Sequence, residues 1–109
     1  MRAKSDRLRG NLELLLLSVL EHEPLHGYGV LQRLRERSGG VFDLPEGTVY
    51  PSLHRLERDG LLRSEWREVD GRRRRVYRTT PAGSSAAVTE RREWARFSRG
   101  VSAVLGGKA

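Results

Sequence analysis

The sequence predicts an α+β domain that is mostly α-helical, on the strength of three observations. Apolar residues recur with helical spacing in three stretches before residue 60, Asp70-Gly71 separates two segments of alternating pattern, and a heptad pattern fills the C-terminal quarter. Three helices followed by a hairpin make a winged helix-turn-helix. We expect this domain over residues 11–80, a basic arm over residues 1–10 and a C-terminal dimerisation helix over residues 81–105.

The composition indicates one small domain with an anionic partner. A chain of 109 residues has the length of a single domain, and its net charge of +7 favours a polyanion such as nucleic acid. The absence of cysteine excludes disulfides and fits a reducing cytoplasm, and the predominance of arginine over lysine is typical of GC-rich bacterial genomes. The leucine run 14–17 is far shorter than the roughly 18 apolar residues of a membrane span. We expect a bacterial cytoplasmic protein without a membrane partner.

The first helix is expected from Asn11 to about His22, after the loose basic arm. Its core face is formed by apolar residues at helical spacing, which are Leu12, Leu15, Leu16, Val19 and Leu20. The following letters, His22-Glu23-Pro24-Leu25-His26, match a zinc motif whose two histidines must lie one turn apart on a continuous helix. Pro24 breaks that helix, and no third ligand is recognisable, so we interpret the segment as a turn and expect no metal.

The second and third helices form the helix-turn-helix. The second is expected from His26 to about Ser38, with Tyr28, Leu31 and Leu34 inside. The third is expected to begin at about Gly47 or Thr48, because Pro51 is tolerated only near a helix start, and to end at Asp59-Gly60. Its apolar stripe is Val49, Leu53 and Leu56.

The other faces of the third helix carry side chains that can donate to bases and phosphates, which are Thr48, Tyr50, His54 and Arg55. Pro51 is expected in apolar or backbone contact. This equipment is typical of a recognition helix in a major groove. An amphipathic core helix with an ordinary solvated face is the alternative.

A hairpin is expected from Leu61 to Thr80, because period-two segments flank the two-residue turn signal Asp70-Gly71. A hairpin directly after a recognition helix is a wing. Its tip carries four consecutive guanidiniums, Arg72, Arg73, Arg74 and Arg75, and we expect part of this run to contact phosphates or the minor groove. A solvated basic face is the alternative.

Thr80-Pro81 opens the last helix with a capping threonine and a proline at the first helical position. Successive a and d positions of its heptads hold Ala87, Glu90, Trp94, Phe97, Val101 and Val104. We expect the apolar members of this stripe to form a dimer seam. Packing of the helix on its own domain is the alternative.

The sequence resembles the PadR-like transcriptional regulators from about Leu8 to Gly83. The matching segments are residues 25–28 (LHGY), residues 47–56 (GTVYPSLHRL) and residues 77–83 (YRTTPAG). The resemblance implies a winged helix-turn-helix that dimerises through C-terminal helices and mostly represses at inverted repeats, here in its short form with one helix after the wing. Gly29 and Thr79 depart from the residues common in the family.

The leading hypothesis is a homodimeric repressor bound to double-stranded DNA and so associated with the nucleoid. His26 and Tyr28 are candidates for phosphate contacts, with a core position as the alternative for Tyr28. The resemblance also implies that some relatives hold planar effectors in an aromatic-lined interface, which suggests a small aromatic effector at Trp94 and Phe97; plain packing is the alternative. A protein-binding winged-helix adaptor is a second hypothesis. The sequence shows no nucleophile-base pair for an enzyme and indicates no cofactor.

Overall fold

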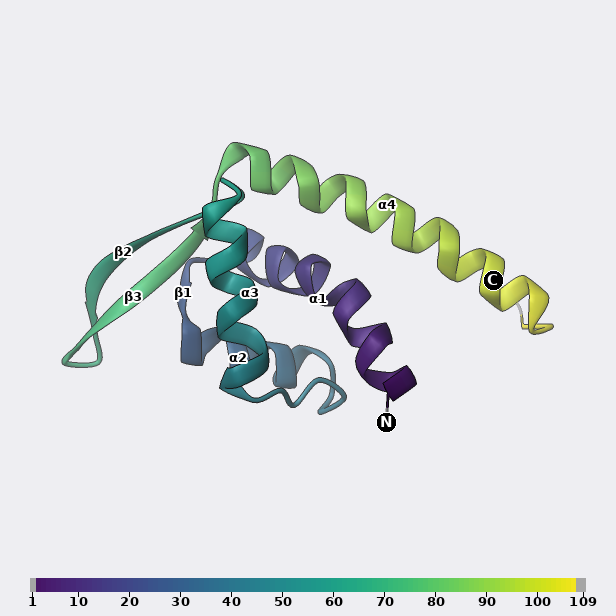
Figure 1. Ribbon diagram of the computed structural model, residues 1–109, viewed down its shortest axis with the longest axis horizontal. Coiled ribbons are helices and arrows are strands. Elements are labelled where there is room, and N and C mark those ends of the chain that lie inside the picture. The colour runs from purple at the N-terminus through teal and green to yellow at the C-terminus, as the bar shows by residue number, and fades with distance from the viewer. Residues whose placement is uncertain (1, 108–109) are drawn as a thin grey trace.

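The computed structural model describes the chain from residue 2 to residue 107, and its side chains from residue 10 onward. Along these residues the elements are α1 (Arg2–His22), β1 (Leu25–His26), α2 (Gly27–Arg37), α3 (Glu46–Arg58), β2 (Leu62–Val69), β3 (Arg72–Thr79) and α4 (Pro81–Val104). The first three helices cluster together, the β2–β3 hairpin projects to one side, and α4 runs away to the other (Figure 1). This arrangement confirms the predicted winged helix-turn-helix with an appended helix.

Helix α1 is longer than expected at its N-terminal end. It begins at Arg2, so the prediction of a loose arm over residues 1–10 is wrong from residue 2 onward. Arginine, alanine, lysine and leucine in this stretch favour the helix, and Ser5 and Asp6 disfavour it less than Gly10 does. Charge repulsion among basic residues therefore does not prevent the helix from continuing.

The core lies where α1, α2 and α3 meet the base of the hairpin. Helix α3 contributes the predicted stripe of Val49, Leu53 and Leu56, each at most 1 % exposed. The remaining buried members of this cluster are Leu12, Leu16, Leu17, Val19, Leu20, Val30, Leu34, Leu62, Tyr77 and Ala87. Full burial of such an aliphatic side chain contributes about 1.5–3 kcal/mol.

The buried face of α2 differs from the predicted one. Val30 and Leu34 are buried, Leu31 is half-buried, and Tyr28 is 50 % exposed, so its assignment to the inner face is wrong. Helix α2 begins at Gly27 because Leu25 and His26 form the short strand β1, which the sequence did not reveal. This start leaves Tyr28 in the first turn, beyond the edge of the core.

The three strands form an antiparallel sheet in the order β1-β3-β2. The hairpin turn lies at Asp70 and Gly71 as predicted, with positive φ angles of 53° and 76°. Two consecutive positive φ angles are typical of a type I′ turn, which suits the twist of a two-residue hairpin. Strand β1 pairs only with Tyr77 and Val76, so the outer half of the hairpin is a two-stranded ribbon.

The start of α4 is fixed to the turn between α3 and β2. The Thr80 hydroxyl accepts the Gly83 N–H at 3.0 Å, as the predicted cap requires, and donates to the Gly60 carbonyl at 2.7 Å. A Cβ at Gly83 would overlap the carbonyl oxygen of Leu61. Helix α4 therefore packs directly against backbone here, which only glycine allows.

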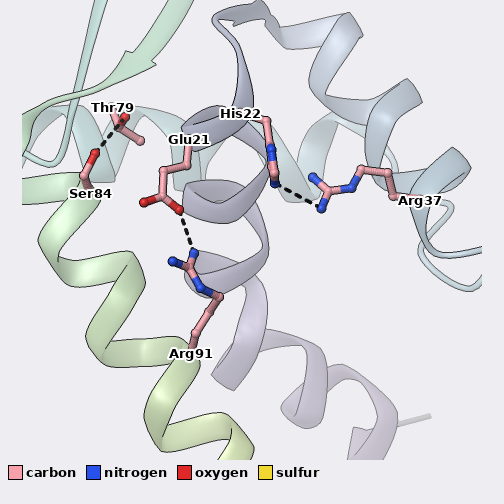
Figure 2. Close-up of polar contacts among 6 residues, drawn as sticks. All are labelled: Glu21, His22, Arg37, Thr79, Ser84 and Arg91. Carbon is pink, nitrogen blue, oxygen red and sulfur yellow. Dashed lines mark hydrogen bonds and ion pairs between the residues drawn. The ribbon is translucent and has the colours of Figure 1, made fainter.

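Helix α4 then lies along α1 before it leaves the domain. Arg91 Nη1 lies 2.6 Å from Glu21 Oε1, and Ser84 bonds Thr79 nearby (Figure 2). Ala87 is fully buried in the core of its own chain, so its assignment to the dimer seam is wrong. The reason is that α1 already covers this part of the heptad face. Beyond Arg91 the stripe is open, with Trp94, Phe97, Val101 and Val104 all exposed.

Candidate nucleic-acid interface

Helix α3 begins at Glu46, one residue before the predicted start, and ends at Arg58 as predicted. Pro51 therefore lies inside the helix, at its sixth residue, rather than in its first turn. The ring of a helical proline meets the residue four positions earlier, which here is Gly47. Both Gly47 and Pro51 are exposed, so the unpaired Gly47 carbonyl can be solvated and the ring meets no side chain.

The exposed face of α3 has a centre and two flanks. Pro51, His54 and Arg58 lie at the centre and are exposed, and sequence reasoning did not include Arg58 in the site. Thr48 is half-buried. Arg55 lies on the flank towards α1, where its Nε is 3.6 Å from Glu13 Oε2 and its Nη2 donates to Ser52 Oγ at 3.2 Å. Arg55 thus has a charged partner, Glu13, among the residues that the structure describes.

Tyr50 lies on the opposite flank, against the first residue of α2. A Cβ built on Gly27 would lie 2.6 Å from Cε1 of the Tyr50 ring, so the ring rests on bare backbone. Burial raises the pKa of Tyr50, Glu46 raises it further, and Arg74 opposes them. The phenol therefore stays protonated and can donate a hydrogen bond near neutral pH.

The four wing arginines do not form one basic tip. They occupy β3 beyond Gly71, so alternate side chains point to opposite faces of the ribbon. Arg73 and Arg75 pack against the Trp66 ring, with guanidinium carbons 5.2 and 5.4 Å from its centroid. Arg72 is exposed beside the turn. The four guanidiniums therefore do not act as one continuous basic run, because the alternation along a strand places neighbouring side chains on opposite faces.

Arg74 points back towards the start of α2. Its Nε is buried and has no hydrogen-bond partner within the described part of the chain. Burial lowers the pKa of His26, Arg74 lowers it further, and Asp70 opposes them. The His26 ring is thus biased towards its neutral form beside a half-buried guanidinium, and its centroid is 6.4 Å from that of Tyr28.

These elements enclose a concavity of about 360 Å³ between α2, α3 and the wing. Its predicted members are His26, Tyr28, Tyr50, His54, Arg73, Arg74 and Arg75, and its unpredicted members are Gly27, Trp66 and Tyr77. Thr48, Pro51, Arg55 and Arg72 lie outside it. Trp66 could have been found from the alternation of β2, which places it on the same face as Ser64.

The histidines of the zinc-like motif do not converge on one helix. His22 is the last residue of α1, and His26 belongs to β1 on the far side of Pro24. His22 instead meets Arg37 at 3.4 Å (Figure 2). Among the side chains that the structure describes, from residue 10 to residue 107, no three potential ligands among histidine, cysteine, aspartate and glutamate come together around a point. Over the same residues, no helix is long and apolar enough to cross a membrane.

Comparison with known proteins identifies the family of this chain. Residues 16–88 match the family described as "Transcriptional regulator PadR-like family". A transcriptional regulator of Mycobacterium tuberculosis is 48 % identical over 96 residues, which are 85 % of this chain and 84 % of that protein.

Solved structures agree in fold. A PadR-like transcriptional regulator from Bacillus cereus superposes with a TM-score of 0.83 at 25 % identity, covering 94 % of this chain and 99 % of that one. A PadR family transcriptional regulator from Eggerthella lenta does so with a TM-score of 0.80 at 33 % identity, covering 95 % and 89 %. The chain belongs to the PadR-like family of transcriptional regulators, and it is a regulator rather than an enzyme.

Proposed function

We propose that the protein is a homodimeric repressor that binds an inverted-repeat operator in double-stranded DNA. The observation that carries this proposal is the concavity, in which Tyr50 and His54 of α3, the start of α2 and three wing arginines line one surface. The net charge of +7 attracts duplex DNA to such a surface. The adaptor alternative is disfavoured because interface cores between proteins are depleted of charge.

Helix α3 is assigned to the major groove. His54 at the centre of its exposed face and Thr48 at its start can read base edges, and Pro51 offers an apolar contact. Tyr50 can donate to a phosphate from its place against Gly27. Arg55 would exchange its contact with Glu13 for one with DNA, since that pair is half-exposed and weak.

The wing and the start of α2 are assigned to the DNA backbone. Arg72 and Arg73 are exposed on the ribbon, and Arg74, beside His26 and Tyr28, has an Nε that finds no hydrogen-bond partner among the described residues. Phosphate contacts of this kind position a protein without reading sequence. Arg75 is left out of this assignment, because Ser64 and Glu57 are its partners within the chain.

Binding of labelled duplexes followed by fluorescence anisotropy tests these assignments, with an operator selected from random DNA. His54→Ala or Arg55→Ala should cost about 1–3 kcal/mol on the operator and flatten the preference over random DNA. Arg73→Ala with Arg74→Ala should weaken all binding and reduce the salt slope by about 0.9 per lost contact. Arg99→Ala, an exposed arginine of α4, is the control. Absence of any salt-dependent duplex binding would refute the proposal.

The dimer is assigned to the exposed part of α4. Phe97, Val101 and Val104 line a groove of about 670 Å³ that continues to Leu105, and contiguous exposed apolar surface of this kind marks an interaction site. Phe97→Asp should yield monomers in sedimentation and weaken operator binding. Ala103→Asp, an exposed residue of α4 outside this stripe, should leave a dimer. A Phe97→Asp protein that remains dimeric would remove the seam.

A small aromatic effector is assigned to the same seam. The Trp94 and Phe97 rings lie 6.0 Å apart at 33° and are both exposed, so a planar molecule can contact both. Aromatic ligands should quench tryptophan fluorescence in the wild type and much less in Trp94→Ala. Equal quenching in Trp94→Ala, through Trp66, would refute this assignment.

A further inference from the structure

Glu57, in the last turn of α3, connects the recognition helix to the wing. Its Oε2 accepts the Ser64 hydroxyl at 2.6 Å and lies 3.7 Å from Arg75 Nη2. Arg75 Nε donates to the same Ser64 oxygen at 2.7 Å. The three side chains come from α3, β2 and β3, and two hydrogen bonds and one ion pair join them in a triangle between the helix and both strands of the wing.

The contacts continue outward along the ribbon through Trp66. The Arg75 guanidinium lies 5.4 Å from the centroid of the Trp66 ring, and Arg73 packs on the same ring at 5.2 Å. This part of the hairpin lies beyond the two residues of β3 that pair with β1. An isolated two-stranded ribbon is marginally stable and free to twist, so an anchor at its base fixes the direction of its outer half.

The negative charge of Glu57 distinguishes a structural role of this residue from a direct electrostatic effect on DNA binding. An acid beside a basic surface repels a polyanion, so the removal of a bystander acid strengthens binding to any DNA. Glu57 is 29 % exposed and faces Arg75 rather than solvent. Glu57 therefore favours operator binding only if the geometry that it maintains increases operator affinity by more than its repulsion of DNA decreases it.

We propose that Glu57 is a positioning residue for operator recognition, which sets the angle between α3 and the wing through Ser64 and Arg75. Arg75 then holds the wing to α3 through contacts inside the protein and does not contact a phosphate, contrary to the expectation from the sequence. This inference rests on the proposed DNA-binding function and deepens it. It predicts that specificity depends on an acid that contacts no DNA.

The test compares operator and random duplexes with full-length protein. Glu57→Gln should weaken operator binding about tenfold, within the usual range for coupled contacts, while binding to random DNA is unchanged or stronger. Glu68→Gln is the matched control, because it removes the same charge from the wing face that carries Ser64 and Trp66, where no ion pair of Glu68 is found among the described residues. It should raise both affinities together.

Arg75 provides the second readout. Arg75→Ala should lower operator affinity with an unchanged salt slope, and the double variant with Glu57→Gln should be no worse than either single variant. A reduced salt slope with additive losses would assign Arg75 to a phosphate and overturn the proposal. Ser64→Ala should repeat the loss of specificity with no change in charge.

Misfolding and failure of the parent proposal give different results. A Glu57→Gln protein that fails to fold loses random-DNA binding as well, and Ser64→Ala then decides whether the triangle is needed. A wild type without operator preference would refute the proposed function. A wild type with operator preference that both variants retain would refute the positioning role alone.

Discussion

Gly27 is the residue whose substitution tests the packing behind the recognition surface most directly. It is the first residue of α2, and its backbone does not adopt a positive φ angle, so alanine fits the local conformation. The obstacle is the Tyr50 ring of α3. Gly27→Ala therefore perturbs one contact between the two helices of the helix-turn-helix and leaves the backbone of α2 unstrained.

The magnitude follows from the distances. The new Cβ would lie 2.6 Å from Tyr50 Cε1 and 2.9 Å from Cζ, whereas carbon atoms prefer roughly 3.5–4.0 Å, so the ring must move by about 1 Å. Overpacking of this kind costs about 1–3 kcal/mol. Alanine in a helix gains up to about 1 kcal/mol over glycine. We expect a net loss of about 1 kcal/mol in the free energy of unfolding.

A double-mutant cycle in urea measures the contact. In a Tyr50→Ala background the ring is absent, so Gly27→Ala should stabilise the protein by about 0.5–1 kcal/mol. The same substitution thus changes sign between the two backgrounds. If Gly27→Ala stabilises the wild type as well, or destabilises both backgrounds equally, the Tyr50 ring does not rest on Gly27. Operator binding of the single variant should weaken, because the displaced ring belongs to the concavity.

Two further predictions concern stability and pH. Gly83→Ala should lower the free energy of unfolding by about 3 kcal/mol, because the Leu61 backbone cannot yield. Gly10→Ala, with open space around it, should raise this free energy by about 1 kcal/mol. Equal effects of the two substitutions in urea unfolding would contradict this packing. The pKa of His26 is lower in the folded protein than the ordinary histidine value of about 6.5. The resulting contribution to stability is fully present above pH 6.5, and it is lost as pH falls through the pKa of the folded state. His26→Gln should flatten the decline in thermal stability below pH 6.5, and an unchanged decline would exclude His26 as its source.

Local patterns predicted the elements that local physics determines. The spacing of Val49, Leu53 and Leu56 identified the buried face of α3, and the Asp70-Gly71 pair identified the hairpin turn. Each depends on a few neighbouring residues and on one rule of backbone geometry. The pattern of α2 failed because a short helix with a tyrosine in its first turn offers two plausible inner faces.

The features that sequence reasoning missed depend on distant partners. Strand β1 has only two residues, and its partners Val76 and Tyr77 lie some fifty positions away, so no periodicity reveals it. The heptad pattern placed Ala87 on an apolar stripe but could not say what covers it. Helix α1 covers that position, and a pattern within α4 carries no information about α1.

Helix α4 consists of a fixed first part and an exposed second part, and this arrangement can connect the proposed effector site to the DNA-binding surface. Its first turns are fixed by Thr80, Gly83 and Ala87 to the α3–β2 turn and the core, while its exposed stripe begins at Trp94, seven residues after Ala87 and about 10 Å further along the helix. Because the first turns of α4 are fixed to the domain, a movement of the helix also moves the domain. In the proposed dimer, an effector that changes the crossing of two α4 helices at the seam must therefore rotate each helix-turn-helix with its α4. The spacing of the two α3 helices would then leave the value of about 34–36 Å that two half-sites require.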